Sequence, residues 1–285
     1  MLQLRTFLLL QILAFLPATA SAELLLDLPP ILAGALKNSG TCTPVSNPFS
    51  FSGLQWTVRS GSGGPGPNNW AAENVCIDEN GWLHLNITED NGTWSSAEIQ
   101  TVDSLGFGTY QFWIIGQTDT LDPNVTLGLF NYGTEDCIQE IDIELGALGS
   151  NSPIIPLHYS VYPNTEQATC PASCSASSGN CEACETGKYY CTTGGNYTLS
   201  GSYSTHRFTW QSTGIRFQSL HGHQDDDSNS FADWTYAASS SPIDVIPQSP
   251  LPVHINYWLF QGATPTDGKT PQEIIIRQFS YTPEP

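Results

Sequence analysis

The chain has 285 residues, and its 39% hydrophobic residues suffice for a sizeable core in one or two domains. It carries 8 Lys and Arg against 27 Asp and Glu, a formal net charge of −19. This balance makes nucleic acid, anionic lipid and sulfated polymers poor partners, whereas neutral partners remain open.

The first 22 residues have the organisation of a secretory signal peptide. Arg5 supplies the positive charge, residues 7–16 form a nearly unbroken apolar run, and Ala20-Ser-Ala22 is a small-residue cleavage site. The run is too short to span a bilayer. Residues 23–48 include a second apolar stretch, but it contains one Asp and two Pro, which favours a short N-terminal leader segment over a membrane anchor. We therefore expect a secreted protein, extracellular or in the cell wall, with no membrane span.

Two further features agree with secretion. Four glycosylation sequons begin at Asn86, Asn91, Asn124 and Asn196, and the chain has 8 cysteines, an even number. These patterns predict a glycoprotein with disulfide bonds.

From about residue 49 onward, short apolar or alternating runs recur between turn signals, which is typical of an all-β sandwich. In the first run, a glycan on Asn86 would direct Leu83, Leu85 and Ile87 inward. The predicted strands are 82–87, 95–102, 109–116, 126–132, 138–146, 154–163, 205–210, 215–220, 253–260 and 273–281. We expect one domain over residues 49–283, in a monomer.

The segment 140–144 reads Glu-Ile-Asp-Ile-Glu. In a β-strand, Glu140, Asp142 and Glu144 line one face while the isoleucines take the other. Three like charges in a row repel one another, so a fold has little reason to keep them unless they are used. A retaining glycosidase needs two carboxyl groups about 5–5.5 Å apart. Residues i and i+4 of a strand are roughly 13 Å apart at Cα, and long Glu side chains can lean together from the two ends.

The crowding of the three carboxylates has an electrostatic consequence. At least one pKa must rise, which suits a general acid that works near neutral pH. On spacing alone the alternatives stay open, namely an acidic surface strand or a calcium site, since calcium prefers oxygen ligands.

Residues 164–197 differ in composition and read as an insertion loop. They hold five of the eight cysteines among Ser, Gly and Thr. Because five is odd, at least one of them must pair with Cys42, Cys76 or Cys137 if all are oxidised. Cys181 and Cys184 also have the spacing of zinc ligands, but in a secreted chain we expect disulfides and no metal.

The motif at 140–144 resembles the Glu-x-Asp-x-Glu signature of glycoside hydrolase family 16, the retaining endo-β-glucanases, galactanases and transglycosylases. Tyr110 after its Gly-rich turn, the aromatic segments 206–210 and 215–217, and the segment 253–262 are also similar to that family. The resemblance covers about residues 49–283, apart from the cysteine-rich insertion.

This resemblance implies a concanavalin-like jelly-roll β-sandwich with a substrate cleft on its concave face. It implies that Glu140 is the nucleophile, Asp142 the assisting carboxylate and Glu144 the acid/base, with no cofactor. Two departures, Ile138 where many glucanases have Trp and Gln100 where some have Arg, touch substrate contacts rather than the chemistry.

The resemblance also implies substrate-binding roles for Glu98, Tyr162, Asn256 and Trp258. On a strand, Asn256 and Trp258 share one face while Tyr257 takes the other. Aromatic faces combined with convergent polar groups are the usual means of recognising a small ligand.

The function predicted from the sequence is that of a secreted retaining glycoside hydrolase. It would cleave internal β-linkages of a neutral polysaccharide, with β-1,3- or β-1,3/1,4-glucan favoured. A transglycosylase acting on the same glycans and a non-catalytic glycan-binding module are the alternatives.

Overall fold

The structure is a computed structural model, and it describes residues 42–150, 154–165, 174, 179–184, 187–238, 241–269 and 272–285. The predicted signal peptide, most of the leader and part of the cysteine-rich insertion lie outside these ranges. Within them, no helix is both long and apolar enough to cross a membrane.

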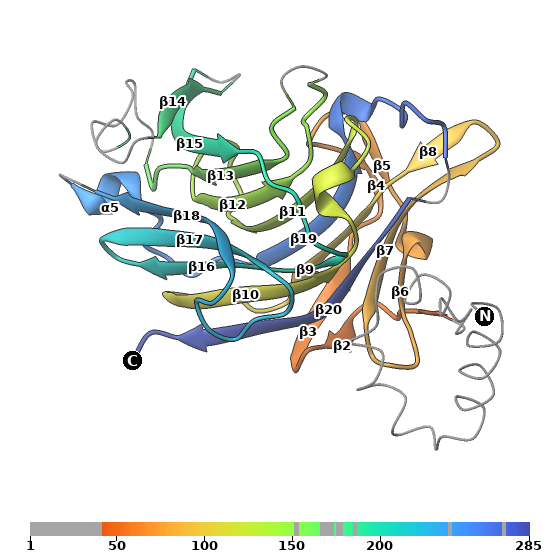
Figure 1. The fold of residues 1–285 in the computed structure, drawn as a ribbon, viewed down its shortest axis with the longest axis horizontal. Coiled ribbons are helices and arrows are strands. Elements are labelled where there is room, and N and C mark those ends of the chain that lie inside the picture. The colour runs from red at the N-terminus through yellow and green to blue at the C-terminus, as the bar shows by residue number, and fades with distance from the viewer. Residues whose placement is uncertain are drawn as a thin grey trace, which may run out of the picture. The chain divides into compact units, whose positions relative to one another are not determined.

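Two antiparallel sheets form the body of the described region (Figure 1). The first sheet has the order β1 (Thr43–Pro44), β6 (Val75–Ile77), β7 (Leu83–Asp90), β20 (Gln272–Pro283), β10 (Gly108–Ile115), β16 (Tyr203–Gln211), β17 (Gly214–His221) and β18 (Ser230–Ala237), with β8 (Thr93–Ser95) paired to β7. The second has the order β14 (Asn180–Ala183), β15 (Tyr189–Gly195), β13 (Leu157–Val161), β12 (Glu140–Leu145), β11 (Val125–Tyr132), β19 (Val253–Leu259), β9 (Ala97–Thr101), β3 (Leu54–Val58) and β2 (Phe49–Phe51).

The remaining elements are short. A hairpin pairs β4 (Gly61–Gly63) with β5 (Asn68–Trp70), and single turns of helix are η2 (Ala72–Asn74), η3 (Thr118–Thr120), α5 (Pro242–Val245) and η4 (Phe260–Gly262).

Apolar side chains from the inner faces of both sheets form the core. The ring of Trp56 of β3 contacts the ring of Phe279 of β20 edge-on, with a centroid distance of 5.6 Å. Tyr159 of β13 stacks on Phe217 of β17, with a centroid distance of 5.0 Å. The Tyr159 hydroxyl also donates to Ser219 Oγ of β17 at 2.7 Å. Because these contacts join the two sheets, the sheets lie face to face, and the predicted all-β sandwich is confirmed.

The ten predicted strands are all present, and Leu83, Leu85 and Ile87 are fully buried, as the alternation of β7 predicted. The sequence did not predict β1 to β6, β8 or β18, nor β14 and β15, which lie in the polar cysteine-rich segment. Strand β12 begins at Glu140 instead of Ile138, because Cys137 and Gln139 take positive φ values of 66° and 56°, outside the β region.

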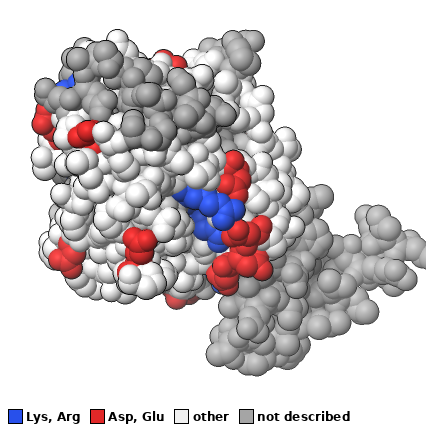
Figure 2. Space-filling model, turned by 90° about the vertical axis from the view of Figure 1, so that its left-hand side faces the viewer, with Lys and Arg blue, Asp and Glu red and all other residues white. Residues whose placement is uncertain are grey.

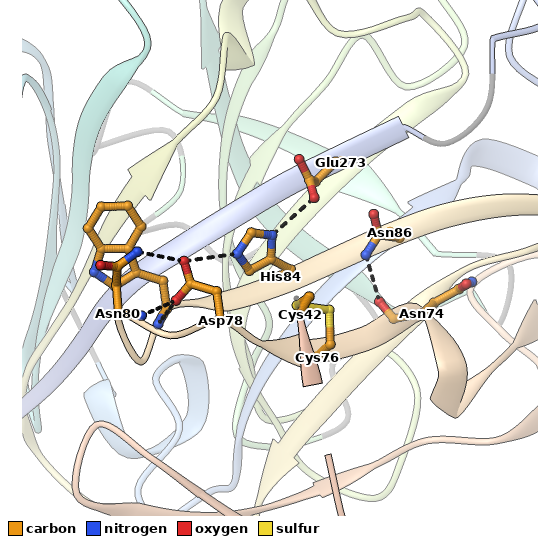
Figure 3. Close-up of a disulfide and its surroundings, with 9 residues drawn as sticks. Cys42, Asn74, Cys76, Asp78, Asn80, His84, Asn86 and Glu273 are labelled. Atoms are coloured by element: carbon orange, nitrogen blue, oxygen red, sulfur yellow. Dashed lines mark hydrogen bonds and ion pairs between the residues drawn. A yellow bond between two sulfur atoms is a disulfide. The ribbon is translucent and has the colours of Figure 1, made fainter. Parts of the chain in front are cut away.

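The folded region already includes residues that we assigned to the leader. Thr43 and Pro44 pair with β6, and a disulfide joins Cys42 to Cys76. Figure 3 shows this disulfide close to His84 of β7. The sandwich therefore starts earlier than the predicted boundary at residue 49.

The cysteines of the insertion behave in two ways. Cys184 forms a disulfide with Cys137, so one insertion cysteine pairs outside the segment as the odd count required. Cys181 is also disulfide-bonded. Cys174 and Cys191 are instead buried thiols that hydrogen-bond to each other, so the condition of the odd-count argument, that all five are oxidised, is not met.

Candidate active site

The three carboxylates of the motif lie on β12, near the middle of the second sheet. Their strand neighbours Ile141, Ile143 and Leu145 are fully buried in the core, so Glu140, Asp142 and Glu144 face away from it. Both Glu side chains are half-buried, whereas Asp142 is only 4% exposed. The predicted alternation is confirmed, and the structure brings the three side chains onto one face.

The environment of the row raises all three carboxyl pKa values. Burial raises the pKa of Asp142 well above its usual range, and the charges of both flanking Glu residues add to this effect. Burial also raises the pKa of Glu144 to about 7. The pKa of Glu140 is raised mainly by burial and by Glu144, while a hydrogen bond from Asp142 acts in the opposite direction.

Asp142 and Glu140 are joined by a hydrogen bond that affects their pKa values in opposite directions. Protonated Asp142 donates a hydrogen bond to Glu140 and so favours its ionised form, but burial and neighbouring charges outweigh this and raise the pKa of Glu140 to about 8. Glu144 retains its own proton up to near-neutral pH. Within the described part of the chain, Asp142 Oδ1 is buried without a hydrogen-bond partner. A buried polar atom left unpaired in this way is typical of a functional site.

Asn256 and Trp258 of β19 lie on the same face as the carboxylates, and Tyr257 and Leu259 point into the core, as predicted. Asn256 Oδ1 accepts a hydrogen bond from the backbone N–H of Gly128 at 3.1 Å. Gly128 sits opposite Glu144 in the register of β11 and β12. A Cβ at residue 128 would approach Asn256 Oδ1 to 2.4 Å, so glycine is needed there for the Asn side chain to lie across β11.

Glu98 of β9 is held by two partners instead of standing free on the sheet. Arg59 Nη1 donates to its Oε2 at 2.7 Å, and His254 Nδ1 lies 3.0 Å from its Oε1. Arg59 also lies over the Trp70 ring at 4.6 Å, and Glu98 is only 4% exposed. Its role as a substrate ligand stays a prediction, because both carboxylate oxygens already have partners.

Tyr162 continues the row on the other side of β12. Its backbone N–H donates to Glu140 O at 2.9 Å, which places it directly beside the predicted nucleophile. Its ring stacks on Tyr190 of β15, with a centroid distance of 4.4 Å and an interplanar angle of 12°. Tyr190 comes from the insertion segment.

The surface of the described region gives two further facts. A hollow of about 260 Å³ is lined by Trp94, Leu259, Thr264 and their neighbours, and its lining includes none of the carboxylates. The concave-face cleft therefore stays a prediction. On the face in Figure 2, uncharged residues predominate and the main basic cluster lies beside acidic residues. Ion pairs such as Arg216 with Asp233 at 2.5 Å neutralise basic side chains in this way.

Sequence reasoning missed four residues around the row. Tyr190 lies in a segment read as a loop, and Gly128 carries no side chain to attract notice. Arg59, which follows β3, and His254 of β19 reach Glu98 from distant parts of the chain, so only their contacts reveal the cluster. Among the residues that the structure describes, no group of three or more His, Cys, Asp and Glu is placed to hold a metal ion.

Comparison with solved structures identifies the architecture. A β-1,3-1,4-glucanase (lichenase) from a mouse hindgut metagenome is 22% identical over 83% of this chain and 96% of its own, with a TM-score of 0.55. The chain has the jelly-roll fold of the β-glucanases. A β-1,3-glucanase of Mycobacterium marinum is 21% identical over 86% of this chain and 95% of its own, with a TM-score of 0.57.

A third structure with this fold carries a different description. An immunostimulatory antigen and pseudo β-1,3-glucanase of Mycobacterium tuberculosis is 18% identical over 81% of this chain and 91% of its own, with a TM-score of 0.57. No protein-family model matches the sequence, and no curated protein is significantly similar to it. Identities this low establish the fold, and the activity has to be argued from the site.

Proposed function

We propose that the protein is a secreted retaining glycoside hydrolase of the family 16 type that cleaves internal β-linkages of a neutral glucan. The observation that carries the proposal is the row of Glu140, Asp142 and Glu144 on the outward face of a central strand, with all three pKa values raised. A fold that used this strand only for packing would gain nothing from three mutually repelling carboxyl groups.

The first chemical step forms a glycosyl-enzyme. The Glu140 carboxylate attacks the anomeric carbon, and the bond from that carbon to the leaving oxygen breaks as Glu144 transfers its proton to this oxygen. The attack requires the ionised form of Glu140, and the hydrogen bond from Asp142 favours that form against the burial that raises its pKa. A pKa of about 7 allows Glu144 to carry the proton that it must donate near neutral pH.

The second step releases the sugar with retained configuration. Glu144, now ionised, takes a proton from water, and the resulting oxygen nucleophile attacks the anomeric carbon and displaces the Glu140 carboxylate. Asp142 donates its hydrogen bond again as the negative charge returns to Glu140. In the transglycosylase alternative, a sugar hydroxyl replaces this water.

The substrate class rests on charge and on the neighbours. The net charge of −19 disfavours sulfated or acidic polymers, and the related folds include enzymes described as β-1,3- and β-1,3-1,4-glucanases. We therefore propose a β-1,3- or β-1,3/1,4-glucan as the substrate. The signal peptide predicted from the sequence supports secretion, and residues 42–283 with their insertion would form the catalytic domain.

Replacement of Glu140 by Gln tests the proposal. This variant should lose hydrolysis of β-1,3- and β-1,3/1,4-glucans while its unfolding temperature stays close to that of the parent. The matched control is Glu79→Gln, at an exposed turn residue, which should keep full activity. If Glu140→Gln retains near-parental activity on every glucan that the parent cleaves, the assigned mechanism is wrong.

Product analysis separates the two remaining candidates from hydrolysis. Chains longer than the supplied oligosaccharide would indicate transglycosylation. The pseudo β-1,3-glucanase with the same fold gives a specific reason to consider a glycan-binding module. Binding without turnover by the parent protein, over a broad panel of β-glucans, would favour that alternative.

A further inference from the structure

The cysteine-rich insertion forms the edge of the second sheet next to the carboxylate row. Its strands β14 and β15 pair with each other, and β15 pairs with β13, with Cys191 opposite Val161. Tyr190, which precedes Cys191, therefore lies opposite Tyr162, which follows Val161, and the two side chains share one face of the sheet. The two stacked rings extend the row that starts at Glu140 across two more strands.

Tyr190 also shares an electrostatic environment with the carboxylates. The pKa of its hydroxyl is raised to about 12, first by burial and then by the negative charges of Glu144, Glu182 and Asp142. The phenol is thus close enough to the row to sense two of its members. Both Tyr162 and Tyr190 are only half-buried, so part of each side chain is accessible.

Two links fasten this hairpin to the loop that leads into the catalytic strand. A disulfide joins Cys184 to Cys137, three residues before Glu140. Lys188 Nζ forms an ion pair of 2.6 Å with Glu135 of the same loop. The position of Tyr190 relative to the nucleophile is therefore set covalently as well as by strand pairing.

The sheet provides different contacts on the two sides of β12. On the β11 and β19 side lie Asn256 and Trp258, with the Glu98 cluster beyond them. On the β13 and β15 side lie the stacked tyrosines. A glycan bound across β12 must extend over both sides, because the bond to be cleaved lies between Glu140 and Glu144.

We propose that Tyr190, together with Tyr162, forms an aromatic platform for the glucan units on the β13–β15 side of the cleaved bond. Tyr190 is then a specificity-determining residue supplied by the insertion, and the Cys137–Cys184 disulfide is its positioning element. Sugar rings present apolar C–H faces that pack on aromatic side chains, and the phenol hydroxyls can hydrogen-bond their rims. This inference rests on the proposed function of the carboxylate row.

The platform should act by binding and not through the chemistry. Removal of the Tyr190 side chain takes away contact area on one side of the glycan, so KM for longer chains should rise while kcat for them changes less. A purely structural role predicts a lower unfolding temperature with no dependence of KM on chain length. The dependence of KM on glycan length therefore distinguishes a binding role of Tyr190 from a purely structural one.

The first experiment measures glycan binding in the Glu140→Gln background, where turnover does not interfere. With β-1,3- and β-1,3/1,4-linked glucose oligosaccharides of increasing length, Tyr190→Ala should weaken the Kd of the longer ones by about tenfold to a hundredfold, the loss expected for one buried aromatic side chain. Tyr190→Phe, which keeps the ring, should stay close to the parent value. Tyr189→Ala, a neighbour whose side chain faces the opposite side of β15, is the matched control.

The second experiment measures KM and kcat in the active enzyme. Tyr190→Ala and the double variant Cys137→Ser/Cys184→Ser should both raise KM for long chains, and their combination should add little, because both act through one element. Tyr190→Leu keeps apolar bulk without the ring and serves if the Ala variant does not fold.

The outcomes separate the inference from the proposed function. If Tyr190→Ala and Tyr190→Leu bind and turn over long chains like an active parent, the platform is refuted and the hydrolase assignment stands. If the parent neither binds nor cleaves any glucan, both fail. If the disulfide variant behaves like the parent while Tyr190→Ala does not, the positioning role of the disulfide is refuted.

Discussion

Replacement of Glu144 by Gln should stabilise the protein at alkaline pH and not at acid pH. Burial raises the pKa of Glu144 from its ordinary value of 4.5 to about 7. The folded state thus binds this proton more tightly than the unfolded state does. The stabilisation from the bound proton is fully present below the unfolded pKa and is lost as pH rises through about 7, above which the ionised carboxylate costs free energy.

The magnitude follows from the size of the shift. A rise from 4.5 to about 7 corresponds to about 3 kcal/mol of preference for the neutral form. Glu144 is half-buried, so screening by solvent reduces the cost of its charge, and we expect a stabilisation of about 1 to 2 kcal/mol from the Gln variant above pH ~8. For a domain of this size, that corresponds to an increase of about 2 to 8 °C in Tm.

Chemical unfolding of parent and variant over about pH 5 to pH 9 measures this effect. The difference in unfolding free energy should be small at the acid end and should grow as pH passes through about 7. Glu79→Gln, at an exposed position, is the control and should show no such trend. A Glu144→Gln variant that is equally or less stable than the parent at alkaline pH would refute the reasoning. The same pKa predicts that kcat of the parent falls above pH ~7, as the acid loses its proton.

Three other changes test the surroundings of the site and the edge of the sandwich. Gly128→Ala should displace Asn256, because the new Cβ would lie 2.4 Å from its Oδ1. We expect a higher KM and an unfolding free energy lower by about 1 to 3 kcal/mol. Unchanged kinetics would contradict the role of this contact. His84 lies between Asp78 and Glu273 (Figure 3). Burial alone would lower the pKa of His84, but its hydrogen bonds and charge interactions with Glu273 and Asp78 outweigh burial, so the pKa is raised. His84→Gln should therefore lower the unfolding free energy below pH ~6.5, and this loss should shrink as pH rises through the pKa of His84 in the folded state. A loss of unfolding free energy that grows with pH would refute this reasoning. Cys42→Ser/Cys76→Ser should lower the unfolding free energy by about 4 kcal/mol, because the bond closes a loop with a separation of 34 residues, and an unchanged unfolding midpoint would contradict it.

The sequence was sufficient where side-chain alternation reports burial directly. Glu140 to Leu145 alternate between carboxylates and apolar residues, and the structure places them on opposite faces as a strand requires. Asn256 and Tyr257 separate in the same way on β19. Period-2 patterns predict faces well because a central strand has only two environments.

The sequence was insufficient where contacts join residues distant in the chain. Arg59 and His254 both contact Glu98 although they are far apart in sequence, and no local pattern reports this pairing. The insertion is polar, so its strands lack the apolar alternation on which prediction depends. Their pairing depends instead on the neighbouring β13 and on Cys184, which is why Tyr190 was not recognised beside the carboxylates.

The position of β12 explains how the fold can keep the carboxylate row. Ile141, Ile143 and Leu145 are fully buried, and burial of such side chains contributes about 2 kcal/mol each. This gain on the inner face exceeds the cost of about 1 to 2 kcal/mol from ionised Glu144 on the outer face. Neighbours on both sides also fix the strand, through Gly128 of β11 and the β13 pairing. An edge strand would lack one of these neighbours and could move away to relieve the crowding, so a central strand is where three adjacent carboxyl groups can be held in a fixed geometry.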